Sequence, residues 1–131
     1  MSTINQQIRI ARPSDNIDDL KKFYIDGLGF KIISEFDLDG YRGMILGHER
    51  HGYHLEFLQE YGIHYGKAPS HEHLLVFYFS DVSAWQSAVA CMSRIGALPV
   101  ESHNPYWVQY GVTYEDADGY RVVLQNSRWK R

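Results

Sequence analysis

The chain has 131 residues, of which 44% are hydrophobic and 22% are charged, with a formal net charge of −3. A chain of this length can bury its own core, and this hydrophobic fraction is too high for a disordered protein. Because there is no basic field and no apolar run near the ~18 residues of a membrane span, we expect neither nucleic acid nor a membrane as a partner.

Cys91 is the single cysteine, so no internal disulfide can form. That fits a reducing compartment, and residues 1–12 have no apolar signal segment, so we expect a cytoplasmic protein. Aromatic residues make up 15% of the chain, with ten tyrosines. This is more ring surface than a small core needs, and it indicates a lined pocket or an interface.

The first half of the chain has the pattern of a strand, a helix and three more strands. A strand over residues 7–12 is followed by a helix that Asn16 can cap and that Gly29 ends. Asp39-Gly40 is a hairpin turn signal. The other strands are predicted over residues 30–36, 41–46 and 53–59.

The same order of elements is predicted again in the second half. Residues 60–72 are rich in glycine and polar side chains and have no periodicity, which predicts a linker. Asp81 opens a second amphipathic helix that Gly96 ends, and Asn104-Pro105 predicts a turn. Strands are expected over residues 74–79, 98–101, 106–114 and 120–126.

The two halves keep register, because Gly29 and Gly96 lie 67 residues apart, as do Gly52 and Gly119. We therefore expect an α+β fold in which two βαβββ modules form one cup-shaped sheet. A single domain of residues 1–131 is predicted, with module one at about 5–60, the linker at about 60–72 and module two at about 73–127.

Two stretches resemble the glyoxalase/bleomycin-resistance/dioxygenase family, also called vicinal oxygen chelate proteins. The stretch of residues 15–30, with its Phe23-Tyr24 and Leu28-Gly29-Phe30 elements, is similar to the first helix of that family. The stretch of residues 115–124 is similar to its Asp-Pro-Asp-Gly turn and final strand, with Ala117 in place of proline. The resemblance implies the fold, but this fold hosts isomerisation, ring cleavage, epoxide opening and drug binding, so the reaction must be argued from the site.

In metal-using members of that family, the first and last strands of each module each supply one metal ligand. The resemblance places these four positions at Arg9, Glu56, residues 74–76 and Val123. Arginine has no lone pair to give, and leucine and valine cannot coordinate a metal, so Glu56 is the one usable ligand. Since a catalytic metal needs about three protein ligands, we expect no metal cofactor at this site.

Histidines offer an alternative metal site. His54 lies on the strand face of Glu56, and a shift of register would bring in His73, so a set of His54, Glu56 and His73 could hold Ni, Mn, Fe or Zn. The competing interpretation is that His71 and His73 lie in solvent at the junction of the linker and the next strand.

Without a metal, Glu56 needs a partner, and Arg9 lies on the neighbouring ligand position. We predict a charge-assisted Arg9–Glu56 pair, which is either structural or an anchor for an anionic or carbonyl group of a ligand. If both side chains are buried, Arg9→Ala should destabilise the fold by several kcal/mol. Tyr106 and Trp107 beside Pro105 predict a rigid aromatic wall, either of a pocket or of an interface, and Tyr78 can contribute from the floor.

Three functions remain open at this stage. The first is a metal-free small-molecule-binding protein whose ligand site includes Arg9, Glu56, Tyr78, Tyr106 and Trp107. The second is a divalent-metal-dependent lyase, ring-opening transferase or dioxygenase. The third is a metal-free enzyme with Glu56 as a catalytic general base. For each of them the resemblance implies a small-molecule ligand and a homodimer.

Overall fold

The computed structural model describes residues 6–48 and 50–128. The first module contains a four-stranded sheet, here called sheet A, with strand order β1-β4-β3-β2. β1 runs parallel to β4, and the other neighbours are antiparallel. Its elements in chain order are β1 (Ile8–Pro13), α1 (Ile17–Lys21), the π-helical turn η1 (Lys22–Gly27), β2 (Lys31–Leu38), β3 (Tyr41–Gly47) and β4 (Tyr53–Glu60).

The second module contains a three-stranded sheet, here called sheet B, with strand order β5-β7-β6. A single antiparallel bridge from Val100 to Thr113 marks the place of a fourth strand. Its elements in chain order are β5 (Leu74–Tyr78), α2 (Val82–Arg94), the 3₁₀ turn η2 (Pro105–Trp107), β6 (Gly111–Glu115) and β7 (Arg121–Gln125).

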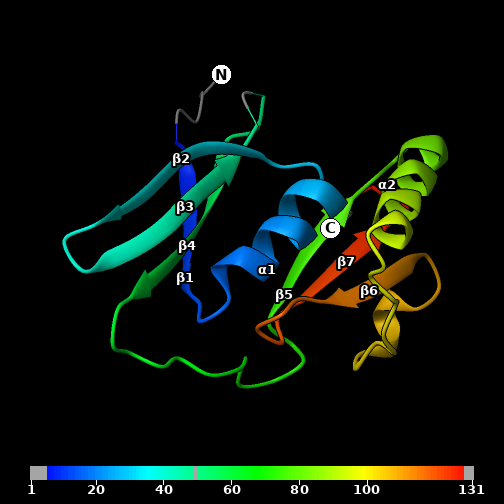
Figure 1. The fold of residues 1–131 in the computed structure, drawn as a ribbon. Helices are drawn as coiled ribbons and strands as arrows, with labels where there is room; N and C mark the ends of the chain where they lie inside the picture. Colours follow the sequence, from blue (N-terminus) through cyan, green and yellow to red (C-terminus); the bar gives the residue numbers. More distant parts are fainter. Residues whose placement is uncertain (1–5, 49, 129–131) are drawn as a thin grey trace.

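α1 lies between the two sheets, and both sheets contribute to one core around it (Figure 1). The Tyr24 ring lies 4.8 Å from the Phe57 ring of sheet A. Phe30, just after η1, packs against Tyr53 of sheet A and Phe77 of sheet B. Its ring centroid lies 6.2 Å from that of Tyr53 and 5.9 Å from that of Phe77. Since side chains alternate along a strand, the residues between these core positions point away from the shared core, on what we call the outer face of each sheet.

A buried polar cluster connects the two modules. The Tyr24 hydroxyl donates to Asp116 Oδ2 at 2.7 Å, and Arg12 Nη1 lies 3.9 Å from the same oxygen. The backbone N–H groups of Asp118 and Tyr120 donate to Asp116 Oδ1 at 2.9 and 3.0 Å. Burial, followed by the nearby Asp116 carboxylate, raises the pKa of Tyr24 well above its usual value, so Tyr24 stays neutral and donates.

The predicted α+β fold of two repeated modules is confirmed, but the strand expected over residues 98–101 is reduced to a single bridge at Val100, and two further corrections apply. The two sheets are separate rather than one hydrogen-bonded sheet, and the strand predicted over residues 106–114 begins only at Gly111. The reason for the second correction is local. Asn104 Oδ1 accepts from Tyr106 N at 3.0 Å and Pro105 fixes the first position of the turn, so η2 forms where an extended strand was expected.

The helix boundaries follow the predicted glycines, but not the predicted cap. Gly29 and Gly96 both have positive φ, of 82° and 83°, as helix-ending glycines do. Asp39 (φ 57°) and Gly40 (φ 84°) form the expected hairpin turn. Asn16 makes no cap hydrogen bond with its side chain, because its Nδ2 donates to Asp118 Oδ1 of the other module at 2.7 Å.

Asp15 fixes the linker to the first module. Its carboxylate accepts from Gly66 N at 2.8 Å and Tyr65 N at 3.0 Å, and these bonds, together with His64, lower its pKa. Its stabilising contribution is therefore present above its unfolded pKa of about 3.9 and is lost as the pH falls through the lower folded value.

For Asp15→Asn, we expect the loss in free energy of unfolding relative to the wild type to be larger at pH 6 than at pH 2.5. Urea unfolding at both pH values measures this difference. Asp39→Asn, in the exposed β2–β3 turn, is the matched control and should show no such change with pH. A loss of stability in Asp15→Asn that is the same at both pH values would show that the ionised Asp15 carboxylate does not fix the linker.

Candidate functional site

The outer face of sheet B carries the aromatic residues predicted to form a wall. Tyr78 pairs with Gln125 and Val76 pairs with Val123 across the parallel β5–β7 register, so Tyr78, Gln125 and Val123 share this face. β6 adds Gly111 opposite Gln125 and Thr113 opposite Val123. η2 then brings Tyr106 and Trp107 against the same face.

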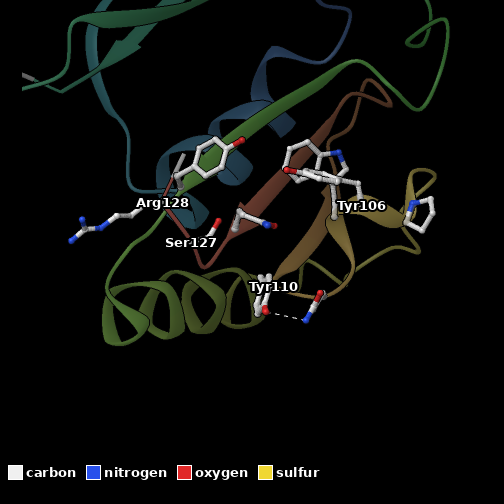
Figure 2. Close-up of a pocket in the computed structure, with 9 residues that line it drawn as sticks. Tyr106, Tyr110, Ser127 and Arg128 are labelled. Carbon is white, nitrogen blue, oxygen red and sulfur yellow. Dashed lines mark hydrogen bonds between the residues drawn. The ribbon is translucent and has the colours of Figure 1, made fainter. Parts of the chain in front are cut away.

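The outer face of sheet B and η2 border a cavity of about 430 Å³ that we call the aromatic pocket. Figure 2 shows Tyr106 and Tyr110 at the pocket, with Ser127 and Arg128 from the end of the chain on another side. A pocket of this volume is in the size range of small-molecule sites. Its lining consists of Tyr78, Pro105, Tyr106, Trp107, Gln109, Tyr110, Gln125, Ser127 and Arg128.

Gly111 permits the close approach of η2 to the sheet. A Cβ built on Gly111 would lie 2.5 Å from the Trp107 carbonyl oxygen, 2.5 Å from Gln125 Oε1 and 3.2 Å from Val123 Cγ1. No side chain fits there without moving the backbone of η2, because carbon–oxygen contacts this short are repulsive. The glycine therefore sets the distance between the aromatic wall and the floor of the pocket.

Two buried polar atoms on this face have no hydrogen-bond partner among the described residues. They are Gln125 Oε1 and Thr113 Oγ1, whose residues are 5% and 4% exposed. Buried polar groups in proteins nearly always have a partner, and of these two residues only Gln125 lines the aromatic pocket, where a ligand or water can donate a hydrogen bond to it.

Arg9 and Glu56 lie elsewhere, on the outer face of sheet A. Arg9 pairs with His54 and Ala11 pairs with Glu56 in the parallel β1–β4 register. The predicted Arg9–Glu56 contact is present, with Arg9 Nη1 3.5 Å from Glu56 Oε1. It is not a fully buried pair, because the Arg9 side chain is 49% exposed and that of Glu56 is 17% exposed. The condition for a large effect of Arg9→Ala, that both side chains are buried, is therefore not met, because Arg9 lies on the edge strand β1 and is half exposed among the described residues.

Because water screens this pair, Arg9→Ala should cost about 0.2–1 kcal/mol in free energy of unfolding rather than several. Chemical denaturation at low and high salt measures it, and the loss should shrink as the salt concentration rises. Lys31→Ala, at an exposed position of β2, controls for the removal of a cation from sheet A. A loss above 3 kcal/mol would show that the pair is desolvated in solution.

The residues present do not fit a metal at the family positions. Arg9 is cationic, and Val123 is fully buried and apolar. Within residues 6–48 and 50–128, no three His, Cys, Asp or Glu side chains lie together so that they could hold a metal ion, so one chain does not assemble His54, Glu56 and His73. His73 instead packs edge-on against Tyr120 with the ring centroids 5.9 Å apart.

The structure thus divides the predicted site residues into two groups. Tyr78, Tyr106 and Trp107 lie together in the aromatic pocket, whereas Arg9 and Glu56 do not line it. Sequence reasoning missed Gln125 and Tyr110, which also line the pocket. Gln125 could have been predicted, because it lies two residues after Val123 and therefore on the same strand face. Tyr110 could not, because a continuous strand was predicted where η2 forms.

The comparisons with known proteins agree with this fold. Two sequence families match, the YycE-like N-terminal domain over residues 8–58 and the YycE-like C-terminal domain over residues 72–126. The uncharacterized protein YycE of Bacillus subtilis is 42% identical over 123 residues, which cover 93% of this chain and 88% of that protein. Among the described residues, no helix has the length and apolarity to cross a membrane.

Solved structures give the same result. The crystal structure of a YycE protein of unknown function from Bacillus subtilis has a TM-score of 0.86 at 42% identity, covering 95% of this chain and 91% of that chain. FosX, a fosfomycin resistance protein from Mesorhizobium loti, has a TM-score of 0.71 at 8% identity, covering 96% and 94%. Glyoxalase I from Leishmania major has a TM-score of 0.69 at 22% identity, covering 95% and 88%, and these two show the fold alone. The chain belongs to the YycE-like family of vicinal oxygen chelate proteins.

Proposed function

We propose that this protein binds a small, flat, partly apolar molecule in the aromatic pocket, without a metal at the ligand positions of the family. The observation that carries the proposal is the convergence of Tyr78, Tyr106 and Trp107 on one cavity of about 430 Å³. Aromatic rings supply contact area to a flat ligand with little loss of side-chain entropy.

Two further features support a bound molecule. Tyr106 and Tyr110 are 72% and 52% exposed, a large apolar area to leave in water without a ligand or partner. The unpaired Gln125 amide lies at the floor of the same pocket, so a ligand with one hydrogen-bond donor or acceptor beside its ring is favoured over a pure hydrocarbon.

The alternative is a divalent-metal-dependent lyase, ring-opening transferase or dioxygenase. It requires a metal bound to Glu56 to take further ligands from beyond the described residues, because Arg9 and Val123 cannot coordinate and residues 6–48 and 50–128 hold no cluster of three His, Cys, Asp or Glu side chains. Glu56 as a metal-free general base remains a third function, and it requires substrate to reach the outer face of sheet A, since Glu56 does not line the aromatic pocket.

A homodimer in the cytoplasm is part of the same proposal. Exposed apolar side chains lie on both modules, among them Ile33 at 51%, Leu38 at 61%, Leu98 at 81% and Val108 at 60%. A second copy covering such surface would gain the free energy of apolar burial. The single cysteine, Cys91, is free, which fits a reducing compartment.

A fluorescence titration with 8-anilinonaphthalene-1-sulfonate, a flat aromatic probe, tests the binding site. We expect saturable binding of one probe per chain, weakened about tenfold or more in Tyr106→Ala and Trp107→Ala, since tenfold corresponds to about 1.4 kcal/mol. Tyr61→Ala, an exposed tyrosine of the first module, is the control and should bind as the wild type does. Equal affinity in all three variants would contradict the proposed pocket.

Metal analysis of the purified protein separates the alternatives. The proposal expects less than stoichiometric Ni, Mn, Fe or Zn and unchanged probe affinity after treatment with a chelator. One metal ion per chain that is retained by the wild type and lost in Glu56→Gln would establish the metal-dependent alternative instead.

A further inference from the structure

A second cavity lies between the two sheets, at the edge of the shared core and apart from the aromatic pocket. Its volume is about 160 Å³. It shares no lining residue with the aromatic pocket. We call it the inter-sheet cavity, and its apolar walls come from both modules, principally Phe30, Tyr53, Phe77, Phe79, Ala88 and Leu124.

Rings that meet edge to face shape this cavity. Phe30 meets Tyr53 at an interplanar angle of 77° and Phe77 at 64°. Such pairs leave flat ring faces and positively polarised ring edges, which suit a further aromatic ring. Ala88 of α2 contributes only a methyl group where a leucine would fill much of the space.

Two histidines of the β3–β4 loop stand at the cavity. The His51 ring stacks on the Tyr53 ring with centroids 5.2 Å apart and planes inclined by 6°, and the His48 ring lies 5.1 Å from that of His51. His51 and Tyr53 also line a larger cleft of about 430 Å³ that continues between β4 and β5. The inter-sheet cavity therefore has a route to the surface past His51, and its polar groups are at that end.

We propose that the inter-sheet cavity is a second binding site, which takes a monocyclic aromatic molecule of the phenol type with its hydroxyl toward His51 and Tyr53. The size fits, because an engineered apolar cavity of about 150 Å³ in another protein stays dry and binds benzene. An apolar void leaves its lining atoms without dispersion partners, so a ring that fills it is favoured.

The polar end selects the hydroxyl. An imidazole nitrogen can accept the proton of a phenol, and the Tyr53 hydroxyl can donate to its oxygen. Burial raises the pKa of Tyr53, so that hydroxyl keeps its proton. The proposal is independent of the one for the aromatic pocket, because the two sites have no residue in common.

Titration with phenol by calorimetry, together with the NMR signal of the Ala88 methyl group, tests the site. Phenol should shift the Ala88 methyl resonance with a saturable dependence on concentration, and Ala88→Leu should remove one phenol-binding event from the calorimetric titration or weaken it at least tenfold. Ala90→Leu, an exposed position on the same helix, is the matched control and should bind as the wild type does. The phenol concentration that half-shifts the Ala88 methyl resonance should be the same in Tyr106→Ala, because Tyr106 does not line the inter-sheet cavity.

A variant with a larger cavity provides a second test if Ala88→Leu unfolds the protein. Phe79→Ala enlarges the cavity and should raise the affinity for 2-naphthol relative to phenol at least tenfold over the wild-type ratio. An Ala88 methyl signal that does not move at saturating phenol would overturn the proposal. So would a naphthol-to-phenol affinity ratio that Phe79→Ala leaves unchanged, or an Ala88 methyl shift that is lost in Tyr106→Ala.

Discussion

Replacing Asp116 by alanine should lower the free energy of unfolding by about 3–5 kcal/mol, the cost of removing one partner from a buried charged cluster. Asp116 is 6% exposed and accepts hydrogen bonds from Tyr24 and from two backbone N–H groups, with Arg12 nearby. Without the carboxylate these donors are buried and unpaired. Because Arg12 and Tyr24 belong to the first module, the loss should affect both modules together, in a single unfolding transition.

Urea unfolding of Asp116→Ala and of two comparison variants measures this loss. Asp116→Asn keeps an acceptor for the backbone N–H groups and should lose less than Asp116→Ala, whereas Asp26→Ala, which removes an exposed carboxylate, should stay within about 0.5 kcal/mol of the wild type. A loss below 1 kcal/mol for Asp116→Ala would show that water satisfies the cluster and that it does not hold the modules together.

The pH dependence of Asp116 runs opposite to that of Asp15. Burial raises the pKa of Asp116 against the lowering effect of its hydrogen bonds and Arg12, so the folded state binds its proton more tightly than the unfolded state. This contribution to stability is complete below the unfolded pKa of about 3.9 and is lost as the pH rises through the higher folded value. The difference in free energy of unfolding between the wild type and Asp116→Asn should therefore be larger at pH 3 than at pH 6. A difference that grows with pH would contradict this and would show that the attraction of Arg12 outweighs the effect of burial on the Asp116 carboxylate.

Replacing Gly111 by alanine should destabilise the protein by about 1–3 kcal/mol and disrupt the aromatic pocket at the same time. The added Cβ would lie 2.5 Å from the Trp107 carbonyl oxygen, which belongs to the backbone and cannot turn aside as a flexible side chain can. η2 must then move away from sheet B and carry Tyr106 and Trp107 with it. We expect probe affinity to fall at least tenfold at a temperature where the variant is still folded.

Gly52→Ala is the matched control, because a Cβ built on Gly52 has no heavy atom within 4 Å. It should change neither the unfolding midpoint nor probe affinity beyond the error of measurement. If Gly111→Ala were as stable as Gly52→Ala and bound the probe with wild-type affinity, the distance between η2 and the sheet would not control the pocket.

The sequence by itself determined the local elements and their repetition. Periodic apolar positions and helix-ending glycines are short-range signals, which is why both helices, the Asp39-Gly40 turn and the strand face of Glu56 could be predicted. The family resemblance, which puts Arg9 and Glu56 on neighbouring ligand positions, predicted their contact, and the two side chains do lie on one face of neighbouring strands. Donor chemistry argued against a metal at the family positions, because only Glu56 among them can coordinate.

Only the tertiary structure decided how those faces are used. Tyr24 and Asp116 are 92 residues apart, so no local pattern announces that they meet in the core. The exposure of Arg9 depends on what packs over an edge strand, and the aromatic pocket depends on a 3₁₀ turn folding back over Gly111. The inter-sheet cavity lies between two sheets that are not hydrogen-bonded to each other and that both pack into the one core around α1. Side-chain alternation fixes which way a residue points, whereas long-range packing fixes what it meets there.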